Sequence, residues 1–286
     1  MINNEKNRVE GGVLYLVATP IGNLADISER AKKVLSEVDF VAAEDTRNSA
    51  KLLGCYGIRA ELVSHHEHNR KESGARIIAR LLSGESCALI TDAGMPAISD
   101  PGEDLVAACA DAGLPVRIVP GCCAAVSALA LSGLPTGRFA FEGFLPAVKG
   151  DRRRRLDALR GEERTMIFYE APHKLKATLA DMCAVFGEDR RIALCRELTK
   201  LNEETVRITL GGAKAWHDEH EPRGEYVLVV EGGKAIAEDN PLTSLSPEEH
   251  VGHYEALGMA RMDAIKAAAK DRGMTKSELY KLLQSD

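Results

Sequence analysis

Carboxylates follow two apolar runs of the sequence at points where they could take part in proton transfer. Glu44 and Asp45 come directly after DFVAA (39–43), and Glu170 lies near the end of the run TMIFYEA (165–171). A carboxylate held beside a hydroxyl can accept its proton and make the oxygen a better nucleophile. The same residues at the end of a strand can instead cap a turn or form an internal ion pair. Glu44, Asp45 and Glu170 are therefore candidate catalytic residues, and for Glu44 and Asp45 this structural role is the alternative.

Three loops rich in glycine and proline follow apolar runs and could hold a ligand. They are ATPIGNLAD (18–26), TDAGMPAISDPG (91–102) and PGCCAAV (120–126). Glycine lets the backbone approach a ligand closely, and proline stiffens a turn. Any tight turn between a strand and a helix also favours these residues, so one such loop would decide little. Three of them predict a ligand cleft, and none matches G-x-G-x-x-G or G-x-x-x-x-G-K-[ST], which disfavours a Rossmann dinucleotide site or a P-loop.

The densest polar cluster is HEHN, at 66–69. Its spacing could suggest zinc, but no cysteine lies nearby, and two neighbouring histidines in a loop have no fixed ligand geometry. The sequence therefore predicts no metal site.

Between Val13 and Gly133 the sequence predicts alternating strands and helices, and these elements must position the residues described above. Short β-branched runs separated by helical stretches are typical of βαβ units on a parallel sheet. The predicted strands are 13–19, 39–43, 60–64, 87–91 and 116–120, with helices in a segment opened by Asp26, at 71–83 and at 102–113. Ligands bind beyond the carboxyl ends of the strands in such a sheet, which is where the three loops lie.

The pattern restarts after SGLPTG, with strands predicted at 139–146, 165–171, 191–198, 204–210 and 225–232. Helices are predicted at 151–160 and 172–186, and the later strands are expected to form hairpins, which gives a mixed sheet. A polar linker leads to two helical segments, 259–273 and 275–284, in which Thr275 and Glu278 predict a capping box. We therefore expect an α/β fold with domains at 12–134 and 135–234, followed by a linker and helical hairpin at 235–286.

The composition is that of an ordinary globular protein, with 45% hydrophobic and 28% charged residues. A net charge of -6 argues against a protein that grips nucleic acid over its whole surface. The seven cysteines are odd in number and include no C-x-x-C pair, which indicates reduced thiols. The apolar stretches fall short of the roughly 20 residues that cross a bilayer, and the N-terminus has no apolar signal segment. We expect a cytoplasmic protein with no membrane partner.

With these loops and strands identified, the chain resembles the ribosomal RNA small subunit methyltransferase I family of the tetrapyrrole methylase superfamily. The resemblance runs from Gly12 through the C-terminal helices. Its motifs are LYLVATPIGNLADIS (14–28), AEDTR (43–47), HEHN (66–69), DAGMPAISDPG (92–102), FEGFLP (141–146), FYEAPHK (168–174), RELTK (196–200) and RGEYVLVVEG (223–232). Together these motifs are specific, although each one alone is not.

The resemblance implies 2′-O-methylation of a cytidine ribose in the decoding centre of 16S rRNA, on the small ribosomal subunit, by a homodimer. It implies that S-adenosylmethionine (S-adenosyl-L-methionine) binds between two α/β domains of the tetrapyrrole methylase fold. The cofactor-binding residues that it implies belong to the three loops. They are Thr19, Pro20, Gly22, Asn23, Asp92, Ala93, Gly94, Pro96, Ser99, Asp100, Pro101, Gly102, Gly121 and Ala124.

Two residues depart from the family's motifs. The family usually reads P-G-P where this chain has Cys122 in third place, and D-A-G-T-P where this chain has Met95. Losing a proline loosens a loop, and losing a hydroxyl removes a hydrogen bond.

Basic and polar side chains outside the loops are candidates for RNA contact. Arg152 and Arg155 belong to KGDRRRR (149–155), and on a helix they would share a face that could meet phosphate. The alternative is an ordinary solvated face. The other candidates for RNA contact or substrate orientation are Arg47, His66, His68, Asn69 and Lys200.

Two other functions stay open at this point. A methyltransferase of the same fold could act on a precorrin-type tetrapyrrole, although such enzymes typically show a G-x-G-P-G first loop and lack the C-terminal helix pair. A ribosome assembly factor without catalytic activity would keep the fold, and Met95 and Cys122 leave room for it. The three intact loops argue against the second reading.

Overall fold

The computed structural model describes residues 8–100, 102–233 and 241–284. Contacts between residues divide the chain into two units, and each is described by itself. The first unit comprises residues 1–157 and 164–231, and the second comprises 158–163 and 232–286.

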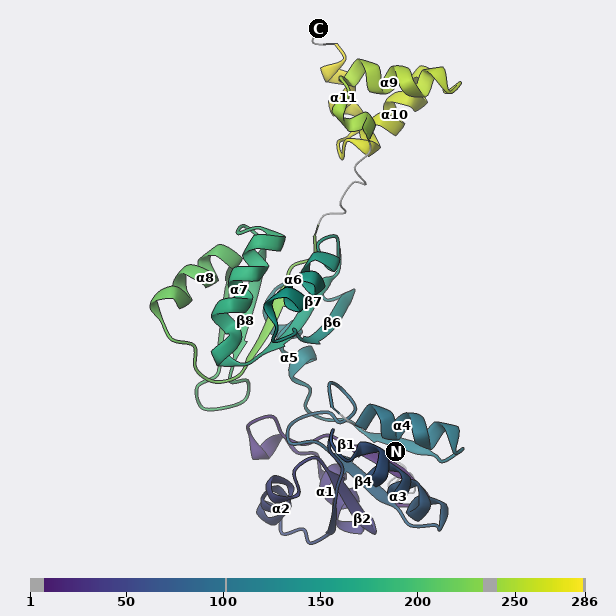
Figure 1. The fold of residues 1–286 in the computed structure, drawn as a ribbon, viewed down its shortest axis with the longest axis vertical. Coiled ribbons are helices and arrows are strands. Elements are labelled where there is room, and N and C mark those ends of the chain that lie inside the picture. Colours follow the sequence, from purple (N-terminus) through teal and green to yellow (C-terminus); the bar gives the residue numbers. More distant parts are fainter. Residues whose placement is uncertain (1–7, 101, 234–240, 285–286) are drawn as a thin grey trace, which may run out of the picture. The chain divides into compact units, whose positions relative to one another are not determined.

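The first sheet of the first unit is wholly parallel and contains all five strands predicted for this region. Its strands β1, β2 and β4 are labelled in Figure 1. Its order is β3-β2-β4-β1-β5. The strands are β1 (Leu14–Val17), β2 (Phe40–Ala43), β3 (Glu61–Ser64), β4 (Cys87–Ile90) and β5 (Val116–Val119). Every residue of β1, β2 and β4 is buried, as expected when helices cover both faces of a parallel sheet.

Two helices pack on each face of this first sheet. Side chains of α1 (Glu29–Glu37) and α2 (Thr46–Cys55) join one apolar cluster, and those of α3 (Arg70–Leu82) and α4 (Gly102–Asp111) join the other. The segment opened by Asp26 begins differently from the prediction. Asp26 ends a short 3-10 turn (Leu24–Asp26), and the Ser28 hydroxyl caps α1 by accepting a hydrogen bond from the Ala31 N–H. A serine hydroxyl at that position satisfies a helix N–H that would otherwise lack a partner.

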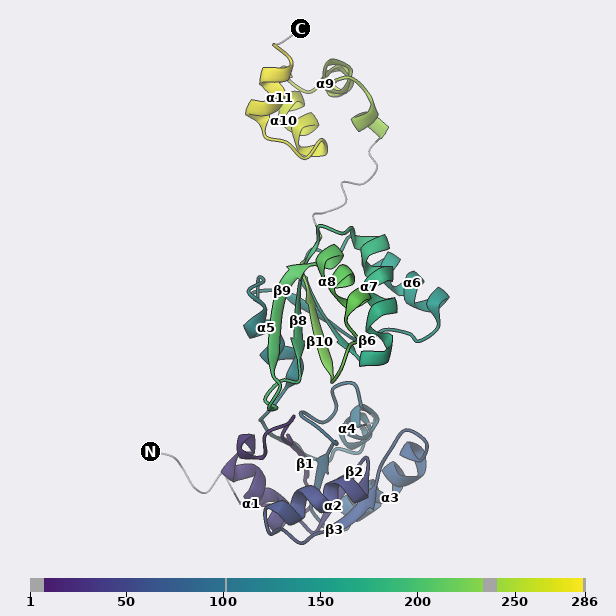
Figure 2. The same ribbon diagram turned by 90° about the vertical axis from the view of Figure 1, so that its left-hand side faces the viewer.

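The second sheet is mixed, with the order β6-β7-β10-β8-β9. Its strands are β6 (Phe139–Phe144), β7 (Thr165–Glu170), β8 (Arg191–Arg196), β9 (Glu204–Thr209) and β10 (Tyr226–Val230), all five as predicted. Only β6 and β7 pair in parallel among these neighbours. Figure 2 shows α5 (Ala124–Ser132) on one side of this sheet and α6 (Lys149–Ala158), α7 (Pro172–Phe186) and α8 (Leu210–Glu219) on the other.

The hairpin prediction holds for β8 and β9 but is wrong for β9 and β10, because α8 connects them and β10 inserts between β7 and β8. The helix α8 was not predicted because Gly211 and Gly212 lie in its first turn and glycine has a low helix propensity. The fold uses both glycines for close packing. A Cβ atom on Gly211 would lie 2.9 Å from Glu188 Cβ, and one on Gly212 would lie 2.7 Å from the Ile208 side chain.

The second unit is a small helical bundle. The predicted hairpin is present as α10 (Arg261–Asp271) and α11 (Lys276–Leu282), and the capping box of Thr275 and Glu278 is confirmed. The helix α9 (Pro247–Ala256) was missed and lies in the predicted linker, where Ser246 and Glu249 form a second capping box. The domain limits at 12–134, 135–234 and 235–286 stay a prediction. Within the described ranges, no helix combines the length and the apolar character that a membrane span requires.

Candidate active site

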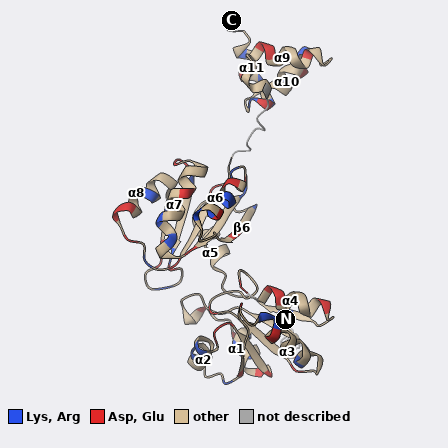
Figure 3. Ribbon diagram, in the orientation of Figure 1, with Lys and Arg blue, Asp and Glu red and all other residues tan. Residues whose placement is uncertain are grey.

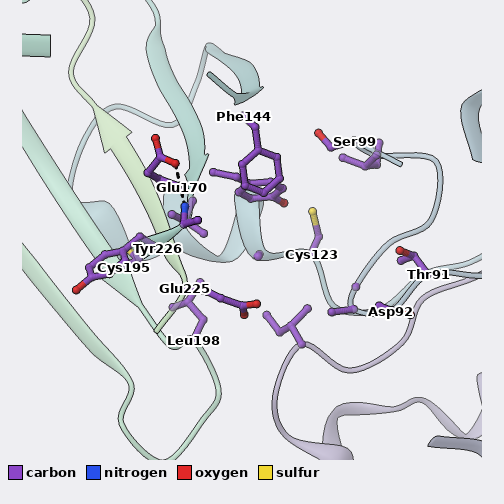
Figure 4. Close-up of a pocket in the computed structure, with 18 of the residues that line it drawn as sticks. Thr91, Asp92, Ser99, Cys123, Phe144, Glu170, Cys195, Leu198, Glu225 and Tyr226 are labelled. Atoms are coloured by element: carbon purple, nitrogen blue, oxygen red, sulfur yellow. Dashed lines mark hydrogen bonds between the residues drawn. The ribbon is translucent and has the colours of Figure 1, made fainter. Parts of the chain in front are cut away.

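A cavity of about 720 Å³ lies in the first unit, between the loops of the first sheet and one end of the second sheet (Figure 4). Figure 4 shows Thr91, Asp92 and Ser99 on one side, and Cys195, Leu198 and Tyr226 on the other. The predicted site residues that line it are Glu44, Asp92, Ala93, Gly94, Ser99, Asp100, Ala124, Glu170 and Lys200. The predicted residues that do not line it are Thr19, Pro20, Gly22, Asn23, Asp45, Arg47, His66, His68, Asn69, Pro96, Gly102, Gly121, Arg152 and Arg155. Pro101 lies outside the described residues.

Thr19 does not line the cavity, but its hydrogen bonds join two of the predicted loops that surround it. Its N–H donates to the Gly94 carbonyl at 2.9 Å, and the Gly94 N–H donates to the Thr19 carbonyl at 3.2 Å. The Thr19 hydroxyl, fully buried, donates to the Thr91 carbonyl at 3.2 Å. These reciprocal bonds fix the carboxyl ends of β1 and β4 side by side, so Thr19 has a structural part in the site.

Asp100 holds the second loop in an uncommon backbone conformation. Its Oδ1 accepts hydrogen bonds from the N–H groups of Ala97 (3.0 Å) and Gly102 (2.7 Å), and its Oδ2 accepts one from Ile98 (3.3 Å). Ala97 and Ser99 have positive φ angles of 65° and 63°, a region that residues other than glycine rarely occupy. Three hydrogen bonds to one carboxylate stabilise this strained loop.

The loop that follows β8, residues 197–200, also contains residues with positive φ angles. This loop was not predicted from the sequence as part of the site. Glu197 and Thr199 have φ angles of 51° and 65°. Together with Ala97 and Ser99 they are all the non-glycine residues with positive φ in the part of the chain that the structure describes. Backbone strain concentrates where surrounding structure holds a functional geometry. The motif RELTK was the available sequence signal, but it pointed only to Lys200.

Gly22 brings the first loop against this 197–200 loop. A Cβ atom on Gly22 would lie 2.4 Å from Lys200 Cγ and 2.9 Å from Thr199 Oγ1, so only glycine fits without movement. Thr199 Oγ1 is buried and has no hydrogen-bond partner among the described residues.

Lys200 is held by two carboxylates at the edge of the cavity. Its Nζ donates to Glu197 Oε1 and to Glu225 Oε2, both at 2.9 Å. Burial acts to lower the pKa of Lys200, but the hydrogen bonds to Glu225 and Glu197 outweigh it and raise the pKa. Lys200 therefore stays charged, and its charge is already balanced within the cavity wall.

Aromatic side chains form the wall contributed by β6 and β7. The Tyr169 ring meets Phe141 and Phe144 edge to face, with centroids 5.2 and 5.4 Å apart. Burial raises the pKa of Tyr169 to about 12, so its phenol remains protonated and cannot act as a base at neutral pH. The sequence had offered FEGFLP and FYEAPHK as signals, and neither Phe144 nor Tyr169 was predicted from them.

The three candidate carboxylates occupy very different places. Asp45 caps α2 and pairs with Arg47 at 2.8 Å, and hydrogen bonds from Arg47 lower the pKa of Asp45 to about 2. Glu170 lines the cavity but is 4% exposed, and its oxygens accept from the Ala171 N–H (2.9 Å) and the Thr178 hydroxyl (2.6 Å). The Arg47 partner gives Asp45 the structural role that was its alternative, and the oxygens of Glu170 are already occupied by the Ala171 N–H and the Thr178 hydroxyl.

Glu44 differs from the other two because it is exposed to the cavity. Its Oε2 accepts a hydrogen bond from the Thr91 hydroxyl at 3.2 Å. Burial raises the pKa of Glu44, and the nearby carboxylates of Asp92 and Asp100 raise it further. Glu44 is thus the candidate whose environment most suits proton transfer.

The HEHN segment follows β3, and Asn69 within it stabilises the local backbone. Asn69 Oδ1 accepts from the His66 N–H at 2.8 Å, and Asn69 Nδ2 donates to the Ser64 carbonyl at 3.2 Å. The rings of His66 and His68 meet edge to face with centroids 5.9 Å apart. The described residues include no group of three or more His, Cys, Asp or Glu side chains placed to hold a metal ion.

The basic run lies on α6, which carries blue segments in Figure 3. Arg152 is 6% exposed and forms a buried ion pair with Asp181 of α7 at 2.7 Å. Arg155 pairs with Glu142 of β6. The expected shared face therefore does not exist as a solvent-facing surface, because Asp181 draws Arg152 inward.

The two departures from the expected motifs have ordinary environments. Met95 lines the cavity, and the Cys122 thiol lies 3.7 Å from the Asp26 carbonyl.

Comparison with known proteins places this site in a family. Residues 13–214 match the model of the Tetrapyrrole (Corrin/Porphyrin) Methylases. The chain is 48% identical over 283 residues to the ribosomal RNA small subunit methyltransferase I of Halalkalibacterium halodurans, covering 98% of each chain. It is 46% identical over 275 residues to the protein of that name from Escherichia coli O157:H7, covering 94% of each.

Solved structures share the fold at low sequence identity. A uroporphyrin-III C-methyltransferase from Thermus thermophilus, complexed with S-adenyl homocysteine, has a TM-score of 0.54 and 18% identity over 76% of this chain and 96% of its own. A diphthine synthase has a TM-score of 0.60 and 16% identity over 77% of this chain and 90% of its own. The extent of the sequence matches decides the relationship: the chain belongs to the ribosomal RNA small subunit methyltransferase I family of the tetrapyrrole methylases.

Proposed function

We propose that this protein transfers a methyl group from S-adenosylmethionine to the 2′-oxygen of a cytidine ribose in the decoding centre of 16S rRNA. Its substrate is the small ribosomal subunit, and it acts in the cytoplasm as a homodimer. The observation that carries the proposal is the cavity between two strained loops, in a chain that matches rRNA methyltransferases over 98% of its length.

The residues of the cavity fit S-adenosylmethionine in size and in chemistry. A volume of about 720 Å³ lies within the range of small-ligand sites. Ile21, Leu198 and Val227 supply apolar surface for a purine ring. The carboxylates that line the cavity also favour a ligand with a positively charged sulfur.

The mechanism needs alignment and one proton acceptor from the protein. S-adenosylmethionine, when bound, supplies a methyl group on a positively charged sulfur. Thr19 and Asp100 hold one wall in place, and a fixed wall would limit the directions from which a substrate oxygen could approach the methyl group. Glu44 accepts the proton of the ribose hydroxyl, which makes that oxygen a stronger nucleophile. Tyr169 and Phe144 add aromatic surface to the wall of the same cavity.

Replacing Asp100 with alanine is expected to weaken S-adenosylmethionine binding by about tenfold or more, because three backbone N–H groups lose their acceptor. Asp100→Asn is the matched control. The amide oxygen can replace Oδ1, which accepts two of the three bonds, so binding should weaken only a fewfold. Isothermal titration calorimetry measures both affinities. Equal losses in the two variants would contradict this role of the Oδ1 bonds.

The outward face of α5 supports the homodimer. This helix is apolar on all sides, and Ala125, Ala128 and Leu129 pack on the second sheet while Val126 and Leu131 remain 53% and 38% exposed. A helix that is apolar all round is normally covered on every side. We therefore expect Val126→Glu to convert a dimer to a monomer in sedimentation equilibrium. Ala215→Glu, at an exposed position of α8, should leave the dimer intact.

His66, His68, Arg47 and Lys200 remain candidates for RNA contact. The first three follow strands of the first sheet, and Lys200 lies at the cavity edge. Arg155 remains a candidate, whereas the buried ion pair of Arg152 gives that residue a structural part.

The function is tested with methyl-labelled S-adenosylmethionine and three substrates: small subunits, naked 16S rRNA and a precorrin-type tetrapyrrole. Alkali cleaves RNA through the 2′-hydroxyl, so a 2′-O-methyl group protects the next bond. We expect label on small subunits, recovered in an alkali-stable dinucleotide with cytidine on its 5′ side. Label on the tetrapyrrole alone would overturn the proposal in favour of the related chemistry. Tight subunit binding without transfer would make the protein an assembly factor.

A further inference from the structure

A second cavity, of about 460 Å³, lies on the α8 side of the second sheet, and we call it the α8 pocket. It is lined by Leu194, Arg196, Glu204, Val206, Ile208, Ala213, Trp216, His217, His220, Glu221, Arg223 and Tyr226. Successive residues of a strand face opposite sides, so Leu194 and Arg196 line this pocket while Cys195 lines the first cavity. Tyr226 is the single lining residue that the two cavities share.

A flat aromatic pair borders the α8 pocket. The rings of Trp216 and His220 are stacked with centroids 3.9 Å apart and planes 9° from parallel. His220 Nδ1 lies 2.9 Å from the Trp216 carbonyl oxygen, and since a carbonyl only accepts, Nδ1 donates and fixes the imidazole on the indole. Trp216 remains 58% exposed. The pair is therefore a preformed platform with aromatic surface still open.

One cation at the pocket lacks an ion pair. Arg196 is neutralised by Glu204 at 3.0 Å, and Lys176 neutralises Glu221 at 2.6 Å. Arg223 is exposed, and it forms no ion pair within residues 8–100, 102–233 and 241–284. Its guanidinium is thus available for an anion such as phosphate.

His217 and Tyr226 add uncharged polar groups to the lining of the α8 pocket. His217 is 7% exposed, and its ring meets Tyr226 edge to face with centroids 5.9 Å apart. Burial lowers the pKa of His217, so its imidazole is neutral at neutral pH. His217 Nδ1 lies 3.4 Å from the His220 carbonyl oxygen, which can only accept, so Nε2 of the neutral ring is left as an acceptor for the edge of a ligand ring.

We propose that the α8 pocket binds an unpaired nucleotide, with the base stacked on the Trp216–His220 platform and the phosphate at Arg223. Stacking on an aromatic side chain and a cation for the backbone are the two contacts by which proteins hold single-stranded RNA. The volume suits one nucleotide. That the nucleotide belongs to an RNA strand rests on the proposed function, whereas binding of a free nucleotide does not.

The sequence provides a direct reporter, because Trp216 is the only tryptophan. The full chain, with the first cavity saturated by S-adenosylhomocysteine, is titrated with cytidine monophosphate, cytidine and a short unstructured oligoribonucleotide. We expect saturable quenching of tryptophan fluorescence by all three. His220→Ala should weaken each affinity about tenfold, since base stacking contributes roughly 1–3 kcal/mol. Arg223→Gln should weaken cytidine monophosphate severalfold and leave cytidine unchanged.

Circular dichroism and the thermal midpoint establish that the two variants are folded. Absence of saturable quenching, or quenching that neither variant changes, would overturn the nucleotide site. A change of oligomeric mass in Trp216→Glu would instead make the pocket an interface between copies. If free nucleotides bind as expected but His220→Ala leaves the KM for small subunits unchanged, the RNA assignment is overturned while the nucleotide site stands.

Discussion

Replacing Glu44 with glutamine is expected to lower kcat for methyl transfer by about a hundredfold, the lower end of what a general base contributes. The variant keeps the hydrogen bond from the Thr91 hydroxyl, because the amide oxygen still accepts it. Affinity for S-adenosylmethionine therefore changes little. Single-turnover kinetics on small subunits, together with calorimetry of cofactor binding, measure the two quantities separately.

The pH dependence gives an independent check on Glu44. Burial raises the pKa of Glu44, and the carboxylates of Asp92 and Asp100 add to this. Only the ionised form accepts a proton, so kcat falls as the pH drops through this raised pKa, and the acid limb lies above the usual range for a glutamate. The limb should vanish in Glu44→Gln. Its loss in Asp45→Asn instead would assign proton transfer to Asp45.

Removing Asp181 should cost about 3–5 kcal/mol of unfolding free energy, because the Arg152 guanidinium is left buried without its partner. The carboxylate also accepts from Arg153 Nε at 2.9 Å, but the Arg153 side chain is 49% exposed and can turn to water. Urea unfolding of Asp181→Ala measures the loss. The double variant Arg152→Met with Asp181→Leu should recover most of it, since an apolar pair replaces two buried charges.

The same pair makes stability depend on pH. Burial acts to raise the pKa of Asp181, but hydrogen bonds from Arg153 and Arg152 outweigh it and hold the pKa below its usual value. The contribution is present above the carboxylate's unfolded pKa and is lost as the pH falls through the lowered folded value. The double variant should lack this acid loss. A double variant as unstable as Asp181→Ala would show that packing around α6 and α7, not the charge, dominates.

Local periodicity was enough to predict most of the secondary structure. Strands such as 39–43 and 225–232 are predicted from their apolar, β-branched runs. The capping box at Thr275 is recognised from four consecutive residues. The elements that were missed have weak local signals. Gly211 and Gly212 lower helix propensity in α8, and α9 begins inside a polar stretch where Ser246 and Pro247 were its signals.

The sequence alone also determined the family, since its motifs span nearly the whole chain. It predicted three loops at the cleft, and each has at least one residue in the cavity wall, but the 197–200 loop was not among them. It could not separate Glu44 from Asp45 and Glu170, because adjacent or similar carboxylates differ only in the partners that folding brings to them. Nor could it find that the 197–200 loop meets Gly22, or that Arg152 turns inward to Asp181. Those contacts join residues distant in the chain, and no local pattern encodes them. Only the tertiary structure decides which polar groups pair with one another and which remain free to contact a substrate.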